Sequence, residues 1–545
     1  MREPNEFILA DLINIRARQK PNLDVLTFEH LSLDGGNTPD EVRSYAQLQR
    51  NSNCIAAALV ARGMNKGDRF AIMMRNHPEF VESMIAASVT GCVFVPIDPR
   101  MKGDKLAYML RDSACSGVIC TDYSADQICS VRGQLPDLEW ILALETGESG
   151  AQDIARLDSV ELLSPVLASS AATVEVRDTQ LSDPLQIIYT SGTTGDPKGI
   201  VGDNQRFGGT GMLGFIFGYQ DNERPYTGLS FTHNNAQATA LCPSLMCGYR
   251  AVISRRFTKS KLWEICRRYD CTSFSLIGGI ATAVYSEPPK DNDADNPVRM
   301  VVSGGMPAAI WEPFEQRFGV DVFEFYGASD GGGMAYKPIG EGPVGSFGKP
   351  MPGVIMKILN REGEECPPFS VGEICCRPED GSEAEVEYFN NPDASRSKID
   401  SGWNRSGDMG HTDSEGWLFF DYRKGGGIRH NGDFINTSYV EKVIAENQQI
   451  ADVYVYGVAA ASGAPGEKDV VAAIVVRDKP SFDPARIFSH CRLGLESNFV
   501  PSYLQLVDEI PKTASEKPQE RFLMDQFSLD ANTVFIEQEF SGSSS

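Results

Sequence analysis

In the first part of the chain, segments with apolar residues at helical spacing alternate with short runs that are apolar throughout. The helix pattern covers 44–61, 78–90 and 105–112, and the apolar runs are 69–74, 92–99 and 117–120. Apolar runs of this kind are typical of strands buried on both faces. Strands that alternate with helices predict an α/β fold, with a parallel-rich sheet covered by helices. The segment 146–182 is polar and lacks a period, so we expect an irregular connection there.

The pattern changes in the second half of the chain. Apolar runs at 298–302 and 320–326 flank a helix pattern at 308–318, and both runs end in glycine-rich loops. Short strands with Pro/Gly turns then predict a small antiparallel or barrel-like β subdomain between 343 and 378. The last part reads helix, strand, strand, helix, strand, at 439–446, 451–456, 470–476, 484–497 and 503–507. This order predicts a separate compact α+β unit.

At 545 residues the chain exceeds the size of a single core. Three consecutive glycines at 425–427 offer little resistance to backbone rotation and indicate a linker. We therefore expect a large N-terminal domain at 1–424, a small C-terminal domain at 425–530 and a tail at 531–545.

Composition narrows the class of function. The formal net charge of -24 argues against nucleic acid or an anionic membrane as the main partner. The thirteen cysteines are scattered without a Cys-x-x-Cys pair, which favours a reducing cytoplasm and neither a disulfide framework nor a zinc site. No signal peptide is evident at the start, and no apolar run is long enough to span a membrane.

The stretch from Ile187 to Val201 carries the most specific chemistry. A short apolar run leads into Thr190–Gly199, which holds three glycines, four hydroxyl side chains and Lys198. Glycine lets backbone N–H groups approach an anion, and hydroxyls and lysine add donors, so this loop predicts a phosphate site. An ordinary Gly/Ser/Thr loop is the alternative, which the density of donors disfavours. The usual nucleotide P-loop does not fit, because that motif is a glycine followed by any four residues and then by Gly-Lys-Ser/Thr.

A second glycine pattern is a weaker candidate. Gly209-Thr-Gly-Met-Leu-Gly214 has the spacing of a dinucleotide site. That pattern is informative only between a strand and a helix. Residues 202–207 are polar and show no buried strand, so we interpret these glycines as close packing.

The loop at Thr190–Gly199 resembles, almost letter for letter, the phosphate loop of the adenylate-forming enzymes, which include acyl-CoA synthetases, peptide-synthetase adenylation domains and luciferases. Further motifs follow in family order, and the resemblance extends from about Ser44 to Arg521. It implies the following ATP-binding positions: Thr190, Ser191, Gly192, Thr193, Thr194, Gly195, Lys198, Gly304, Gly305, Met306, Glu324, Phe325, Tyr326, Gly327, Ser329, Asp408 and Arg423.

The resemblance also implies roles within this set. The turn at 303–306 would line the adenine, an aromatic of Phe325-Tyr326 would stack on the base, and Ser329 would contact phosphate or carboxylate oxygen. Asp408 would hold the ribose hydroxyls with help from Arg423, fifteen positions on. Asp330 stands where the family has Glu, and it is implied to bind Mg²⁺ beside the phosphates together with Thr190.

On the acid side, His233 follows a short apolar run. A lone histidine is more often a hydrogen-bonded core or surface residue, but the resemblance gives it a role in orienting the acyl carboxylate. The implied carboxylate pocket comprises His233, Asn234, Gly305, Ala328, Gly331 and Gly332. Its glycine-rich wall fits a ring or a polar head as well as a short chain, so the acid is not determined.

The C-terminal motifs imply a moving domain. Gly425 takes the place of the hinge residue, and Arg429, His430 and Gly432 lie in a loop implied to bind the pantetheine arm of coenzyme A. Lys517 matches the catalytic lysine, with Glu516 where the family has glycine. The implied catalytic residues are thus Lys517, Thr190, Asp330 and His233.

The resulting expectation is an ATP-dependent carboxylate–CoA ligase that forms acyl-AMP with Mg²⁺ and ATP and then transfers the acyl group to coenzyme A. Coenzyme A is favoured because 342–407 most resembles carnitine/crotonobetaine-type CoA ligases and because no carrier or condensation module is attached. Three alternatives remain open: a stand-alone enzyme that loads a carrier protein, a luciferase-like oxygenase, and a non-catalytic nucleotide-binding relative. The oligomeric state, a homodimer included, is also open.

Overall fold

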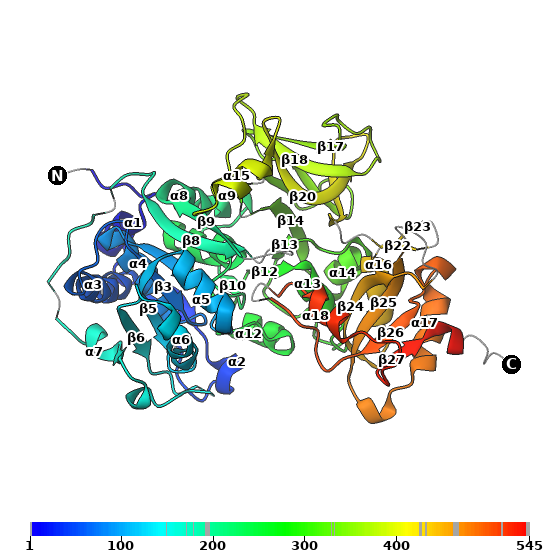
Figure 1. Cartoon of the computed structure of the whole chain (residues 1–545), viewed down its shortest axis with the longest axis horizontal. Helices are drawn as coiled ribbons and strands as arrows, with labels where there is room; N and C mark the ends of the chain where they lie inside the picture. Colours follow the sequence, from blue (N-terminus) through cyan, green and yellow to red (C-terminus); the bar gives the residue numbers. More distant parts are fainter. Residues whose placement is uncertain are drawn as a thin grey trace. The chain divides into compact units, whose positions relative to one another are not determined.

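A computed structural model gives the fold of the chain (Figure 1). It describes residues 3–148, 150–170, 172–177, 179–190, 197–328, 330–331, 333–424, 428–430, 433–435, 437–461, 468–513 and 516–540. The chain divides into two compact units. Unit 1 comprises Met1–Thr258, Glu264–Ser275 and Val386–Ser397, and unit 2 comprises Lys259–Trp263, Leu276–Glu385 and Lys398–Ser545. The domain boundary expected at 424/425 stays a prediction.

The helices and strands expected near the N-terminus are present in unit 1. The helices are α3 (Tyr45–Ala61), α4 (Pro78–Thr90), α5 (Gly103–Asp112) and α6 (Ala125–Val131). The strands are β3 (Arg69–Met73), β4 (Val93–Pro96), β5 (Cys115–Thr121), β6 (Trp140–Leu144), β7 (Val160–Leu162), β8 (Pro184–Thr190) and β9 (Lys198–Asp203). They form a sheet in the order β7-β6-β5-β3-β4-β8-β9, parallel except for the β8–β9 hairpin. The predicted α/β class is confirmed.

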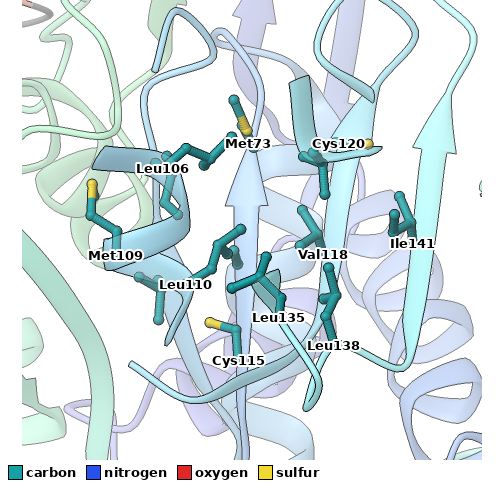
Figure 2. Packing of buried hydrophobic residues seen from close by; sticks show 14 of the residues in the cluster. Met73, Leu106, Met109, Leu110, Cys115, Val118, Cys120, Leu135, Leu138 and Ile141 are labelled. Carbon is teal, nitrogen blue, oxygen red and sulfur yellow. The ribbon is translucent and has the colours of Figure 1, made fainter. Parts of the chain in front are cut away.

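The central strands β3, β4 and β5 are buried on both faces, which explains why their sequences are largely apolar. On one face, α5 and α6 pack against every second residue of the strands, including Met73, Val118 and Ile141 (Figure 2). Their neighbours along the strands, such as Ile72 and Ile119, point to the opposite face and are fully buried as well.

A second sheet of unit 1 brings together strands from distant parts of the sequence. Its strands are β1 (Asp24–Phe28), β2 (Glu41–Ser44), β10 (Pro225–Thr227), β11 (Ala251–Ile253) and β12 (Ser273–Ile277). Strand β10 pairs in parallel with β11 and β12, β11 pairs in parallel with β1, and β2 closes the edge antiparallel to β1.

Two expectations for unit 1 were wrong in part. The segment 146–182 is not irregular throughout, because β7 lies within it and pairs with β6. A three-residue edge strand is too short to give a clear period. A strand, β9, also precedes Gly209, contrary to the expectation for 202–207. The glycines nevertheless lie in the helices α8 (Asn204–Gly211) and α9 (Leu213–Ile216), and two of them pack closely, since a Cβ at Gly211 or Gly214 would press on Met246 or Tyr249, whereas a Cβ at Gly209 would meet open space.

Unit 2 contains two parallel strands, β13 (Met300–Gly304) and β14 (Asp321–Gly327), joined by α14 (Trp311–Phe318). An antiparallel sheet continues from β14, as the turn-rich pattern predicts. Its strands are β15 (Met334–Lys337), β16 (Ser346–Pro350), β17 (Val354–Leu359), β18 (Gly372–Pro378), β20 (Trp403–Thr412) and β21 (Leu418–Arg423).

The C-terminal part of unit 2 has its own sheet, as expected. The strands are β24 (Ile450–Ala459), β25 (Lys468–Val476), β26 (Tyr503–Leu506) and β27 (Val534–Ile536), and the helices are α16 (Thr437–Ala445), α17 (Pro484–Gly494) and α18 (Glu520–Gln526). Helices α16 and α17 pack on one face through residues such as Ile444 and Phe488. Helix α18 lies on the other face (Figure 1), and its Leu523 is buried in a cluster with Tyr456 and Val471.

Candidate functional site

The strands β20 and β21 place Asp408 directly opposite Arg423. Arg423 Nη1 donates to Asp408 Oδ1 (2.5 Å), and Tyr326 Oη at the end of β14 donates to Oδ2 (2.7 Å). Burial, followed by the charge of Asp408, raises the pKa of Tyr326 well above its ordinary value, so the hydroxyl remains a donor. The sequence assigned these three residues to nucleotide binding, and the structure brings them together.

Two residues that the sequence did not indicate hold the stretch of β20 before Asp408. Ser406 Oγ accepts the N–H of Asp408 (2.9 Å), and Glu373 Oε1 on β18 accepts the N–H of Gly407 (3.0 Å). Glu373 is buried and also faces Arg405 and Lys424. In the sequence, Glu373 could have been noticed as a charged residue within an otherwise apolar strand pattern.

Lys517 lies in the electrostatic environment of the same pair. Its side chain as a whole is exposed. Loss of hydration at the ammonium group lowers the pKa of Lys517; the Asp408 carboxylate opposes this shift and Arg423 adds to it. A turn presents the lysine: the N–H of Thr513 donates to Lys517 O (2.8 Å), and the N–H of Lys517 donates to Thr513 Oγ1 (3.1 Å). Lys512 anchors this turn to β24 through Asp452 Oδ2 (2.7 Å).

Glu516, next to this lysine, has a left-handed backbone with φ of +60°. Such a conformation costs a residue other than glycine about 1 kcal/mol. We expect Glu516→Gly to slow amide hydrogen exchange at Lys517 about five-fold, because the turn that protects this amide becomes more stable. Glu516→Ala is the control, since it removes the carboxylate but keeps the strained backbone. Equal exchange in the two variants would contradict the prediction.

Glu324 fixes the turn that follows β13. Its carboxylate accepts the N–H of Gly305 through Oε1 and the N–H of Met306 through Oε2 (3.0 Å). Burial raises the pKa of Glu324 to about 7, although both N–H donors oppose the shift. The sequence assigned Glu324 to the ATP site; in the structure this carboxylate shapes the turn at 304–306.

The raised pKa of Glu324 makes stability depend on pH. Because the folded-state pKa of about 7 lies above the ordinary 4.5, its stabilising effect is fully present at pH below 4.5 and is lost as the pH rises through 7. We expect the free energy of unfolding of wild type relative to Glu324→Gln to fall by about 2 kcal/mol from about pH 5.5 to 8. Urea denaturation at both pH values measures this difference. Glu379→Gln is the matched control, because Glu379 is exposed yet also accepts a backbone N–H, from Gly353; the same pH dependence in both variants would exclude Glu324 as its source.

Asp330 forms an ion pair that the sequence did not predict. Lys398 Nζ, at the end of α15 (Pro392–Lys398), lies 2.8 Å from Asp330 Oδ2 and also donates to Ser406 O (3.1 Å). Among the described residues, no group of three or more His, Cys, Asp or Glu side chains is placed to hold a metal. Mg²⁺ commonly takes one or two protein carboxylates and completes its shell with phosphates and water. Asp330 alone therefore fits such an ion only when phosphates supply the remaining ligands.

The phosphate loop belongs to unit 1, where Thr190 ends β8 and Lys198 begins β9. Lys198 Nζ lies over the Tyr388 ring, 5.1 Å from its centroid. Tyr388 pairs with Ile200 beside β9 and is a contact that the sequence did not indicate. Residues 191–196, with the predicted positions Ser191, Gly192, Thr193, Thr194 and Gly195, lie outside the described residues.

His233, also in unit 1, precedes the short helix α10 (Asn234–Ala236). The segment before it is held by Asn76, which is fully buried and stands three residues after the end of β3. Asn76 Nδ2 donates to Leu229 O (2.9 Å), and its Oδ1 accepts the N–H of Phe231 (2.9 Å). Gln237 Nε2 donates to Phe231 O (2.8 Å). The loop with His233 and Asn234 is thus fixed by buried amide side chains, neither of which the sequence singled out.

The remaining predicted positions are less informative. His430 Nδ1 shares a hydrogen bond with Lys468 O (2.8 Å) and lies 3.6 Å from Asp469 Oδ1. Phe325 and Gly327 lie on β14, followed by Ala328. Gly331 borders a cavity of about 440 Å³ that is also lined by Val354, Arg377 and Glu383. Ser329, Gly332, Gly425 and Gly432, and the side chain of Arg429, lie outside the described part of the structure.

Comparison with known proteins identifies the family. The family model described as "AMP-binding enzyme" matches residues 14–380. The chain belongs to the AMP-binding enzyme family. The model of the AMP-binding enzyme C-terminal domain matches residues 439–517, up to and including Lys517. Lys517 is thus the last residue matched, whereas Asp408 and Arg423 lie between the two matched ranges.

Similar proteins include crotonobetaine/carnitine–CoA ligases. The one from Salmonella paratyphi A is 26% identical over 482 residues, covering 87% of this AMP-binding enzyme and 91% of the relative, and the one from Salmonella typhimurium is 26% identical over 495 residues with the same coverage. An anthranilate CoA ligase in complex with anthranoyl-AMP has a similar fold, with a TM-score of 0.79, 23% identity, and 95% and 96% of the two chains covered. A fatty acyl CoA synthetase from Mycobacterium tuberculosis has a TM-score of 0.67, 24% identity and 96% and 99% coverage. Among the described residues, no helix combines the length and apolar character needed to cross a bilayer.

Proposed function

We propose that this AMP-binding enzyme is an ATP-dependent carboxylate–CoA ligase. Asp408 is the observation that carries the proposal: its carboxylate is fixed by Arg423 and Tyr326 and is electrostatically coupled to Lys517. A carboxylate can accept both hydroxyls of a ribose, and a nearby lysine can neutralise charge at a reacting carboxylate and phosphate. The relatives named crotonobetaine/carnitine–CoA ligase support coenzyme A as the acyl acceptor.

In the first step, a carboxylate oxygen attacks the α-phosphorus of ATP; the new C–O–P bond gives acyl-AMP, and pyrophosphate leaves. No side-chain nucleophile is needed, because in-line phosphoryl chemistry depends mainly on positioning and charge. Thr190–Lys198 would hold the phosphates, and the turn at 304–306 with Phe325 and Tyr326 would hold the base. His233 would orient the incoming carboxylate.

Magnesium belongs to this proposal as the partner of ATP. Asp330, and the hydroxyl of Thr190, would hold it with phosphate oxygens, since these are the hard oxygen ligands that Mg²⁺ prefers. When bound, the ion supplies positive charge to the phosphates. Asp330 must then leave its ion pair with Lys398 or share it.

In the second step, the sulfur of coenzyme A attacks the acyl carbon and AMP leaves. We propose that rotation about Gly425 withdraws Lys517 from Asp408 and brings the loop with Arg429, His430 and Gly432 to the thiol. A domain movement that alternates between two half-reactions is a gating step.

The identity of the carboxylic acid substrate can be approached from the cavity beside Gly331. The cavity beside Gly331 contains the carboxylates Glu383 and Glu385 together with Arg377. The two carboxylates would favour a cationic group on the substrate, and apolar neighbours such as Val354 and Ala384 would accept a small apolar part beside it. This agrees with the betaine acids named for the relatives, so betaines belong in any test together with aromatic, dicarboxylic and short-chain acids.

The test is ATP–pyrophosphate exchange with that panel of acids, followed by thioester formation with coenzyme A. We expect exchange with at least one acid and a thioester from the same acid. Exchange without thioester formation from coenzyme A, but with loading of a holo-carrier protein, would replace the proposal with a carrier-loading enzyme. No exchange with any acid would reject the ligase and leave a non-catalytic nucleotide-binding protein.

A further inference from the structure

The ion pair between Asp330 and Lys398 has no role in the chemistry described so far. We propose that Lys398 is a built-in competitor for the divalent cation at Asp330, and that it sets how tightly the enzyme binds a metal–nucleotide complex. This inference rests on the proposed function, because it concerns the metal that accompanies ATP.

The geometry makes the pair strong. Lys398 Nζ lies 2.8 Å from Asp330 Oδ2, and the two side chains are only 15% and 16% exposed. Water and salt screen the attraction between such largely buried charges less than the attraction between charges at the surface. The ammonium group therefore neutralises the same carboxylate that a divalent ion needs, and the ion has to displace it or share it.

Lys398 has a second partner that would keep it in place after release. Its Nζ donates to Ser406 O (3.1 Å), two residues before Asp408. The lysine thus joins the loop that carries the metal carboxylate to the strand that carries the ribose carboxylate. A metal that takes Asp330 away leaves the ammonium group with a backbone acceptor, so its displacement is less costly than that of an isolated buried lysine.

The loop at Asp330 does not depend on Lys398 alone. Asn404 Nδ2 donates to Asp330 O (3.3 Å), and Cys376 Sγ approaches Gly331 O (3.8 Å). Asn404 is fully buried on β20. Removal of the lysine side chain should therefore take away this ion pair while the backbone of the loop remains anchored.

The experiment measures binding and needs no turnover. Mn²⁺ is titrated into the full-length protein with α,β-methylene-ATP, whose α–β bridge cannot be cleaved, and bound Mn²⁺ is followed by electron paramagnetic resonance. We expect Lys398→Met to bind Mn²⁺ with the nucleotide about ten-fold more tightly than wild type, because Asp330 is no longer neutralised. Lys398→Arg keeps the cation and should remain near wild type.

Two further variants isolate the effect. Lys357→Met removes a lysine from an exposed pair with Glu365 and causes the same change of net charge, so it should leave Mn²⁺ affinity unchanged. In an Asp330→Asn background, Lys398→Met should have no effect, because the competitor has lost its target. Circular dichroism verifies that each variant is folded.

The outcomes separate the two proposals. If wild type binds no Mn²⁺–nucleotide complex, the proposed function fails and this inference fails with it. If wild type binds the complex but Lys398→Met binds it equally or more weakly, only the competitor role is overturned, and weaker binding would make Lys398 a phosphate contact. A ten-fold gain that persists in the Asp330→Asn background would also overturn it.

Discussion

Lys517→Ala is expected to lower the rate of ATP–pyrophosphate exchange about 10³-fold while largely sparing thioester formation from supplied acyl-AMP. The lysine would neutralise charge that builds between carboxylate and α-phosphate only in the first half-reaction. Its position supports this, because its ammonium group is under the electrostatic influence of Asp408 and Arg423. The two half-reactions are measured separately, the second with synthetic acyl-AMP and coenzyme A.

Lys479→Ala is the control for the loss of one C-terminal lysine. Lys479 is exposed, pairs with Asp508 and lies in the same sequence region as Lys517, so both half-reactions should remain at wild-type rates. Equal loss of both half-reactions in Lys517→Ala would contradict the moving-lysine mechanism and would instead indicate damage to nucleotide binding or to the fold.

Asp408→Asn is expected to lower kcat/KM for ATP about 100-fold, which corresponds to about 3 kcal/mol. The change keeps the shape of the side chain but removes its charge. Arg423 and Tyr326 then lose an ionised acceptor, and the amide offers a single oxygen where two ribose hydroxyls would donate. Steady-state kinetics with ATP varied, supported by equilibrium binding of AMP, measures the effect.

The matched control is Asp421→Asn on the neighbouring strand β21. Asp421 is exposed, and its Oδ2 lies 2.9 Å from His411 Nδ1. Because an exposed pair contributes little, removal of this charge should change kcat/KM for ATP less than two-fold. An Asp408→Asn enzyme that binds AMP as tightly as wild type would show that the ribose lies elsewhere, even if the rate falls for another reason.

The sequence predicted the longer helices and the buried strands well. The helix at 45–61 follows from a window of adjacent residues because its burial repeats with the helix period, whereas the helix at 78–90 and the strands β3 and β5 are buried almost throughout and follow from their apolar composition and length. The short strand β7 and the strand before Gly209 gave no such signal, since three to six residues at a sheet edge contain too few repeats.

The order of motifs also determined the family and the candidate residues without a structure. The loop at Thr190–Gly199 has its donors within ten positions, and the spacing from Asp408 to Arg423 is set by one strand connection, so both are local properties of the chain. Their roles in binding stay predictions, as does the hinge at Gly425.

Only the tertiary structure decided which distant residues meet. Lys398 reaches Asp330, Glu373 supports the stretch of β20 before Asp408, Asn76 fixes the segment before His233, and Lys517 lies under the electrostatic influence of the Asp408–Arg423 pair. The sequence gives no signal for the partners of Lys398 and Asn76, because a lysine or a buried amide looks the same in a local window whatever it contacts. The pairings arise when strands from separate parts of the chain enter one sheet and bring their ends together, and that arrangement is a property of the whole fold.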